Sequence, residues 1–266
     1  MKNKVFGAVS ALLFITTLNL RTVNLCYGQQ NLFNIPSGDI TEKNKVFYQH
    51  QINLYNPSSF ESKQHFVYGL GKGWDIGVNV ISVAFDFRNP RYAWVETNAN
   101  PTNQQALSPL VLLTAQKYVK IAKNFKFNIG TQAGTNVATQ AEQMKLTHFS
   151  YGLFGFESNH HLKIMLGGYV TDNYFVGEGV QAGILAGYEI PLSKRWYLMG
   201  DFISGDHASA VSVIGGMFNA GRRVQLCAGA LIANPDSEAK DGIVLELNLL
   251  GWDLWEKEGG TKPKNH

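Results

Sequence analysis

The sequence predicts an all-β protein: a closed antiparallel transmembrane β-barrel of about twelve strands, with roughly ten to fourteen possible. Three observations predict this class. Runs of about ten residues alternate between apolar and polar side chains, which is the period of a strand with two different faces. The runs come in pairs, joined alternately by short turns and longer loops. Only 16% of the 266 residues are charged, against roughly 25% in ordinary soluble domains.

The first stretch, residues 1–28, has the features of a secretory signal peptide. It has a basic start, an apolar core over residues 5–18 that is too short to span a bilayer comfortably, and small residues before a cleavage point after Gly28. An uncleaved anchor helix and a lipoprotein site at Cys26 are the alternatives. Arg21 interrupts the apolar run and argues against the anchor.

Removal of this leader leaves a nearly neutral chain with a single thiol. Lys2, Lys4 and Arg21 leave with it, so that 20 basic and 20 acidic residues remain. This balance gives no case for nucleic-acid binding. Cys227 is the one cysteine outside the leader, so an intrachain disulfide framework is excluded.

The rest of the chain divides into a lead-in, a barrel and a tail. Residues 29–44 show no periodicity and are expected to precede the first strand. Residues 45–252 carry the alternating runs, and residues 253–266 form a charged tail. The prolines avoid strand interiors, where a missing N–H would cost a ladder hydrogen bond. The expected strands are 45–55, 63–71, 74–87, 110–120, 125–134, 146–157, 162–171, 179–190, 196–204, 208–218, 223–233 and 242–252.

The two faces of these strands differ in chemistry. The polar faces are mostly uncharged and rich in glycine, unlike the Lys/Glu-dense exterior of a soluble protein, and suit a hydrated lumen. The opposite faces are rows of aliphatic side chains, as lipid contact requires. A secreted soluble β-protein that buries its apolar face is the alternative. The lumen-lining candidates are Gln49, Gln51, Asn53, Asp75, Asn79, Gln116, Lys126, Asn128, Gln132, His148, Lys163, Glu189, Asp201, Gln225, Glu246 and Asn248.

Aromatic side chains recur beside the short turns, and a second group lies near the longer loops. Two such levels are typical of the interfacial girdles of membrane barrels. A strand of about ten residues also crosses a bilayer at the usual barrel tilt. The interfacial aromatics expected beside the turns are Tyr68, Trp74, Tyr118, Phe125, Tyr188, Trp196 and Trp252.

With these features the chain resembles Gram-negative outer-membrane β-barrel proteins of the porin-like or transporter-annotated type. The similarity covers the leader, the lead-in NIPSGDITEKN, the alternating hairpins and the closing strand, and it includes no motif that identifies a substrate. The resemblance implies residence in the cell outer membrane, contact with its lipid, and insertion by the barrel-assembly machinery. Many such barrels end at an aromatic residue, whereas here residues follow Trp252, so the assembly signal would have to be internal.

One constellation raises the question of catalysis. His148 and Ser150 form a His-x-Ser pair on a strand, with Asn159 nearby, similar to the site of outer-membrane phospholipase. Nucleophilic catalysis requires the Ser and His within hydrogen-bond reach of each other. The alternation assigns His148 and Ser150 to the lumen and Phe149 and Tyr151 to the lipid, whereas the phospholipase pair faces outward. The protein is therefore expected not to be an enzyme.

No cofactor or metal is expected. His160 and His161 are adjacent but lack a Cys or carboxylate partner at ligand spacing, and we interpret them as part of a solvated turn. Gly71-Lys72-Gly73 lacks the glycine spacing and following helix of a phosphate loop, and is interpreted as a hairpin turn.

The first functional hypothesis is a passive channel or transporter for small polar solutes, with the loop 88–108 as its constriction. The lumen candidates carry both signs of charge, for example Lys126 and Asp75, which predicts either weak ion selectivity or an interior plugged and held by ion pairs. Two alternatives remain open: a non-conducting structural or interaction barrel that binds a partner through its outer loops, and a membrane-embedded hydrolase.

Overall fold

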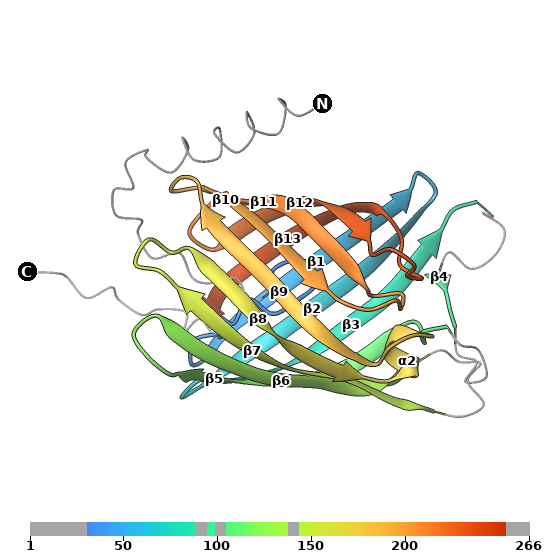
Figure 1. Ribbon diagram of the computed structural model, residues 1–266, viewed down its shortest axis with the longest axis horizontal. Helices are drawn as coiled ribbons and strands as arrows, with labels where there is room; N and C mark the ends of the chain where they lie inside the picture. The colour runs from blue at the N-terminus through green and yellow to red at the C-terminus, as the bar shows by residue number, and fades with distance from the viewer. Residues whose placement is uncertain (1–30, 89–94, 99–104, 138–143, 254–266) are drawn as a thin grey trace, which may run out of the picture.

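The computed structural model describes residues 31–88, 95–98, 105–137 and 144–253. They form a closed antiparallel barrel of twelve strands, which confirms the predicted all-β class and the closed barrel (Figure 1). Strand β1 (Lys45–Asn56) pairs with the last strand, β13 (Gly242–Asp253), and this pairing closes the sheet. The other wall strands are β2 (Ser59–Gly71), β3 (Trp74–Asp86), β5 (Leu110–Lys120), β6 (Phe125–Asn136), β7 (Leu146–Glu157), β8 (Lys163–Thr171), β9 (Ala182–Pro191), β10 (Trp196–Ile203), β11 (Val211–Asn219) and β12 (Val224–Ala233).

Two small elements lie outside the closed wall. β4 (Val95–Glu96) pairs with the end of β3. The short helix α2 (Asn173–Val176) follows β8, and the Asp172 side chain caps it by accepting from the N–H groups of Tyr174 and Phe175. Among the described residues, no helix is long and apolar enough to cross a membrane.

The barrel has two unlike ends. At one, which we call the turn end, short turns join β2 to β3, β5 to β6, β7 to β8, β9 to β10 and β11 to β12. The tightest of these holds Gly71, Lys72 and Gly73 at φ of 85°, 52° and 76°, a left-handed conformation that glycine adopts without strain. The other end, the loop end, carries the remaining connections, most of them longer.

Alternation along each strand sorts side chains between a buried inner face and an exposed outer face. Large apolar side chains are exposed on the outside, for example Leu113 at 70% and Phe154 at 60%. Polar side chains are buried on the inside, for example Gln49 and Asn248 at 0%. This distribution is the reverse of that in an ordinary soluble protein.

Candidate functional site: the plugged barrel interior

The inner wall collects most of the predicted lumen residues. The structure buries or half-buries them on the inner face of the strands. They are Gln49, Gln51, Asn53, Asp75, Asn79, Gln116, Lys126, Asn128, Gln132, Lys163, Glu189, Asp201, Gln225, Glu246 and Asn248.

His148 is the exception, and its assignment to the lumen was wrong. Phe149 and Tyr151 line the interior cavity, so the alternation turns His148 and Ser150 outward. Ser150 pairs in register with Thr131 on the outer face, and their hydroxyl oxygens lie 2.8 Å apart. Both faces of β7 mix polar and aromatic side chains, so polarity alone gave the wrong orientation.

The predicted aromatics lie at the turn end, with one correction. Tyr118 stands opposite Asn128 in the register, and Asn128 is a buried inward-facing residue. Residues opposite each other in an antiparallel pair share a face, so Tyr118 belongs to the inner face and is not an outer interfacial residue. The others are exposed or half-exposed on the outside: Tyr68, Trp74, Phe125, Tyr188, Trp196 and Trp252.

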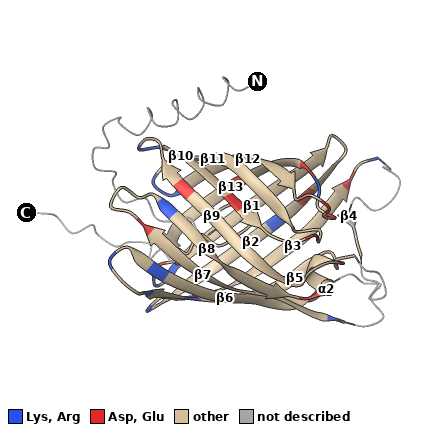
Figure 2. Ribbon diagram, viewed as in Figure 1, with Lys and Arg blue, Asp and Glu red and all other residues tan. Residues whose placement is uncertain are grey.

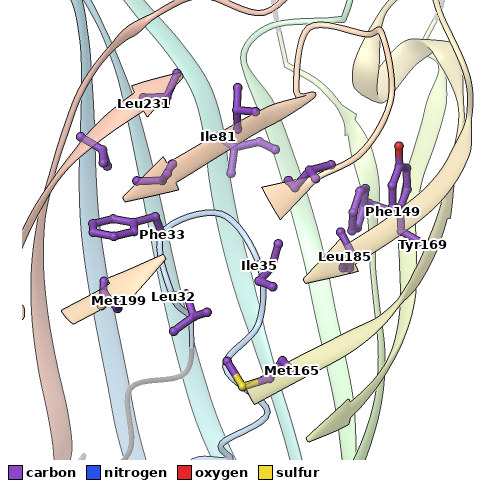
Figure 3. Packing of buried hydrophobic residues seen from close by; sticks show 14 of the residues in the cluster. Leu32, Phe33, Ile35, Ile81, Phe149, Met165, Tyr169, Leu185, Met199 and Leu231 are labelled. Atoms are coloured by element: carbon purple, nitrogen blue, oxygen red, sulfur yellow. The ribbon is translucent and has the colours of Figure 1, made fainter. Parts of the chain in front are cut away.

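Residues 31–44, expected as a lead-in, enter the barrel and fill its turn-end half; we call this segment the plug. Its tip is a turn in which the Leu32 N–H donates to the Ile35 carbonyl at 2.9 Å. Leu32, Phe33 and Ile35 are no more than 1% exposed, packed against side chains of the wall (Figure 3). The wall residues of this cluster that Figure 3 labels are Ile81, Phe149, Met165, Tyr169, Leu185, Met199 and Leu231.

This apolar contact shows that the hydrated lumen suggested by the polar faces does not extend through this part of the barrel. On β7 to β12 the inner face is apolar at mid-height, including Leu185, Met199 and Val213. Those strands carry apolar side chains on both faces at this height, as with the inward Val213 and the outward Ile214. The contrast between faces that reveals a polar lumen is therefore absent from this part of the sequence.

Glycines in the wall provide the space that the plug occupies. A Cβ built on Gly187 would lie 2.4 Å from Leu32 Cδ1, and one on Gly215 would lie 2.7 Å from Phe33 Cζ. At Gly69 it would lie 1.9 Å from the backbone oxygen of Glu42. The wall and the plug thus fit each other at both ends of the segment.

Asp39 connects the plug to two lysines of the wall. Lys126 Nζ donates to Oδ1 at 2.8 Å and Lys163 Nζ donates to Oδ2 at 2.6 Å. Burial by itself would raise the pKa of Asp39, but the two ammonium groups outweigh it and hold that pKa well below the usual range. The carboxylate therefore stays charged, and each of its oxygens is engaged.

Two wall carboxylates hold the plug backbone. Asp201 Oδ2 accepts from the N–H of Asn34 and, at 3.2 Å, from the N–H of Ile35. Asp75 Oδ2 accepts from the N–H of Thr41 at 3.1 Å and from Gln116 Nε2 at 3.0 Å. These bonds satisfy backbone donors that burial would otherwise leave unpaired. Asp75 and Asp201 thus anchor the plug to the wall.

A cavity of about 200 Å³ lies beside the plug tip and extends toward the loop end. This volume is smaller than that of a drug-sized pocket. The plug contributes Phe33 and Asn34 to its lining. One wall is polar, with Asn53, Glu61, Lys63, His65, Asn79 and Gln132, and the other is apolar, with Phe149, Phe175, Ile203, Val211 and Leu231.

The outward His148 belongs to a hydrogen-bonded cluster at the loop end. Its Nδ1 lies 3.0 Å from Asp172 Oδ2. Asp172 also accepts from Thr147 Oγ1 at 2.7 Å and caps α2, which gives it a structural role. In the part of the chain that the structure describes, no hydrogen bond joins Ser150 to His148.

Other predicted features are placed as follows. The Gly71–Gly73 segment forms the hairpin turn expected of it. His161 Nδ1 lies 3.3 Å from Glu157 Oε1 in the turn after β7, and no group of three His, Cys, Asp or Glu with metal-site geometry occurs among residues 31–88, 95–98, 105–137 and 144–253. Residues 1–28, the tail beyond 253 and most of the proposed 88–108 constriction lie outside the described residues.

Comparison with known proteins adds no relative, because no protein-family model and no curated protein matches the chain.

Proposed function

We propose that the protein is an outer-membrane β-barrel of the porin-like type, exported by its signal peptide and inserted by the barrel-assembly machinery. The observation that carries this proposal is the belt of exposed apolar side chains around a closed sheet. Such a surface is unfavourable in water and favourable against lipid, and closure satisfies the backbone hydrogen bonds within the sheet. The belt includes Leu113, Ile129, Phe154, Leu166, Ile184 and Ile214, each more than half exposed.

Heat-modifiable gel migration of membrane-extracted protein tests this placement. A detergent-resistant barrel is expected to migrate differently before and after boiling, and the protein is expected in the outer-membrane fraction. Recovery in the soluble fraction, with identical migration before and after boiling, would contradict it and favour a secreted β-protein.

We further propose that the barrel passes small polar solutes and that the plug closes it at rest. The polar wall of the cavity supports a polar solute, and its volume near 200 Å³ supports a small one. The plug is joined to the wall by side-chain packing and hydrogen bonds and adds no strand to the barrel, so it can move without unfolding the sheet. The role proposed is transport and not catalysis.

Planar-bilayer recordings test this closure. The mature chain is expected to conduct rarely, and a variant lacking residues 31–43 is expected to conduct steadily. Heat-modifiable migration serves as the folding control for both proteins. A folded deletion variant that does not conduct would exclude the channel.

A folded deletion variant that does not conduct would instead favour a structural or interaction barrel. The apolar packing across the lumen supports this alternative.

A further inference from the structure

The turn end of the barrel is basic. Its turns and their flanks carry six exposed cations, which we call the basic rim: Lys72, Lys120, Lys123, Lys194, Arg195 and Arg222. The four turns that supply them contain no acidic residue. Among the described residues, none of the six lies within 4.0 Å of a carboxylate. The basic rim is therefore a group of cations that carry no carboxylate partner from the described part of the chain.

The loop end has the opposite character. The three loops 172–181, 204–210 and 234–241 contain a single basic residue, Lys240. Figure 2 shows mostly Lys and Arg at the turns on the left and mostly Asp and Glu around the loops on the right, with a few charges of the other sign at each end. Each end of the barrel thus carries an excess of one sign of charge. The acidic residues of the three loops are Asp172, Glu178, Asp206, Asp236, Glu238 and Asp241.

Exposed apolar side chains stand among the rim cations. Ile121, beside Lys120 and Lys123, is 56% exposed, and Leu192, beside Lys194, is 51% exposed. Cations mixed with aliphatic side chains suit the boundary between lipid headgroups and acyl chains, because that boundary accommodates both. A soluble protein partner is not needed to explain them.

Tryptophans complete this boundary layer. Lys117 Nζ lies 5.1 Å from the centre of the Trp74 ring, and the Arg223 guanidinium carbon lies 5.3 Å from that of Trp252. Trp196, 55% exposed, follows Arg195 directly. Aromatic rings with cations beside them are typical of the headgroup level of a bilayer.

We propose that the basic rim binds anionic phospholipid headgroups, so that the leaflet at the turn end is enriched in anionic lipid around the barrel. This inference rests on the proposed membrane placement. A cation near an anionic leaflet strengthens binding by about fivefold, and the effect decays over a Debye length of about 10 Å at 0.1 M salt. The acidic loop end repels the same headgroups, so the preference is one-sided.

Tryptophan quenching tests the proposal, because Trp74, Trp196 and Trp252 all lie at the turn end. The mature chain, with Trp94 and Trp255 changed to Phe, is reconstituted in vesicles of phosphatidylcholine with a minority of phosphatidylglycerol. Bromine is placed on the acyl chain of one lipid or of the other. Brominated phosphatidylglycerol is expected to quench several-fold more per molecule than brominated phosphatidylcholine, and high salt is expected to remove the difference.

Two variants complete the test. The variant K120Q/K123Q/K194Q/R195Q/R222Q is expected to lose the preference, and the loop-end variant K145Q/K240Q is expected to keep it. Equal quenching by the two lipids in embedded, heat-modifiable protein would overturn this inference and leave the membrane placement intact. Protein that does not embed in either lipid would overturn both. If the variant with five substitutions folds poorly, the salt comparison on the protein with unsubstituted turns still tests the proposal.

Discussion

Lys163 Nζ lies 2.6 Å from Asp39 Oδ2, although 124 residues separate the two in the chain. The contact joins the first residue of β8 to the plug, and Lys126 occupies the other carboxylate oxygen. Both lysine side chains are less than a tenth exposed. A buried charge without its partner is costly, so these lysines stabilise the seated position of Asp39. Lys126 of β6 and Lys163 of β8 therefore hold the plug against the wall of the barrel.

Replacing Asp39 by Asn is expected to loosen the plug. The substitution removes the carboxylate that both lysines share, and the cost of weakening a buried pair is about 3 kcal/mol. Single-channel recording is expected to show openings that are at least tenfold more frequent. Glu42→Gln is the matched control, because Glu42 is an exposed carboxylate of the same segment. Identical traces for D39N and the unmodified protein would refute the role of this contact.

Acid is expected to release the plug. The folded-state pKa of Asp39 is held below its ordinary value by Lys126 and Lys163, despite burial that would raise it. A depressed pKa contributes stability above the unfolded pKa of about 4, and this contribution is lost as the pH falls through the folded value. The part of the conductance that depends on Asp39 should be steady from neutral pH to about 4 and rise below it. In Asp39→Asn this rise should be smaller, since the group that titrates is gone.

Phe33→Ala is expected to weaken the apolar seal. Phe33 is 1% exposed, and truncating a buried Phe costs about 3 kcal/mol, or roughly a hundredfold in the ratio of closed to open barrels. Protease cleavage within residues 31–44 from the turn side should become faster. Phe154→Ala is the control, because that ring is 60% exposed on the outer face. Equal cleavage rates in the two variants would argue against the seal.

Gly69→Ala is expected to displace the end of the plug where the chain enters β1. The added Cβ would lie 1.9 Å from the Glu42 carbonyl oxygen, and a backbone atom cannot yield as a flexible side chain can. Gly221→Ala is the control, since a Cβ there meets nothing within 4 Å. Urea unfolding should show a lower midpoint for G69A alone. A midpoint unchanged from that of G221A would mean that the close approach is relieved without cost.

His148→Ala and Ser150→Ala are expected to leave phospholipid turnover in reconstituted vesicles at its background rate. Ser150 is hydrogen-bonded to Thr131 and the His148 ring to Asp172, so the activated serine that hydrolysis requires is not assembled. A turnover that falls to zero in both variants would instead establish a hydrolase on the outer face.

The strands could be read from the sequence because alternation is local. A period of two in residues such as 125–134 is set by neighbours along the chain, and the observed β6 (Phe125–Asn136) covers this run. The pattern of short turns and longer loops is equally local. Twelve strands with one apolar face predict a closed sheet, because open edges in lipid would leave backbone N–H and C=O groups unpaired. The fold class followed from these features, and so did the inner position of residues such as Gln49 and Glu246.

Only the tertiary structure decided what fills the barrel. The plug has no periodicity, and its contacts span 87 residues to Lys126 and 167 to Asp201, distances over which sequence patterns carry no signal. The outward turn of His148 depended on the register of β7 with β6, because both of its faces mix polar and aromatic groups. The sequence by itself therefore determined a closed sheet with two faces. The packing of distant segments determined that the sheet is closed around part of its own chain.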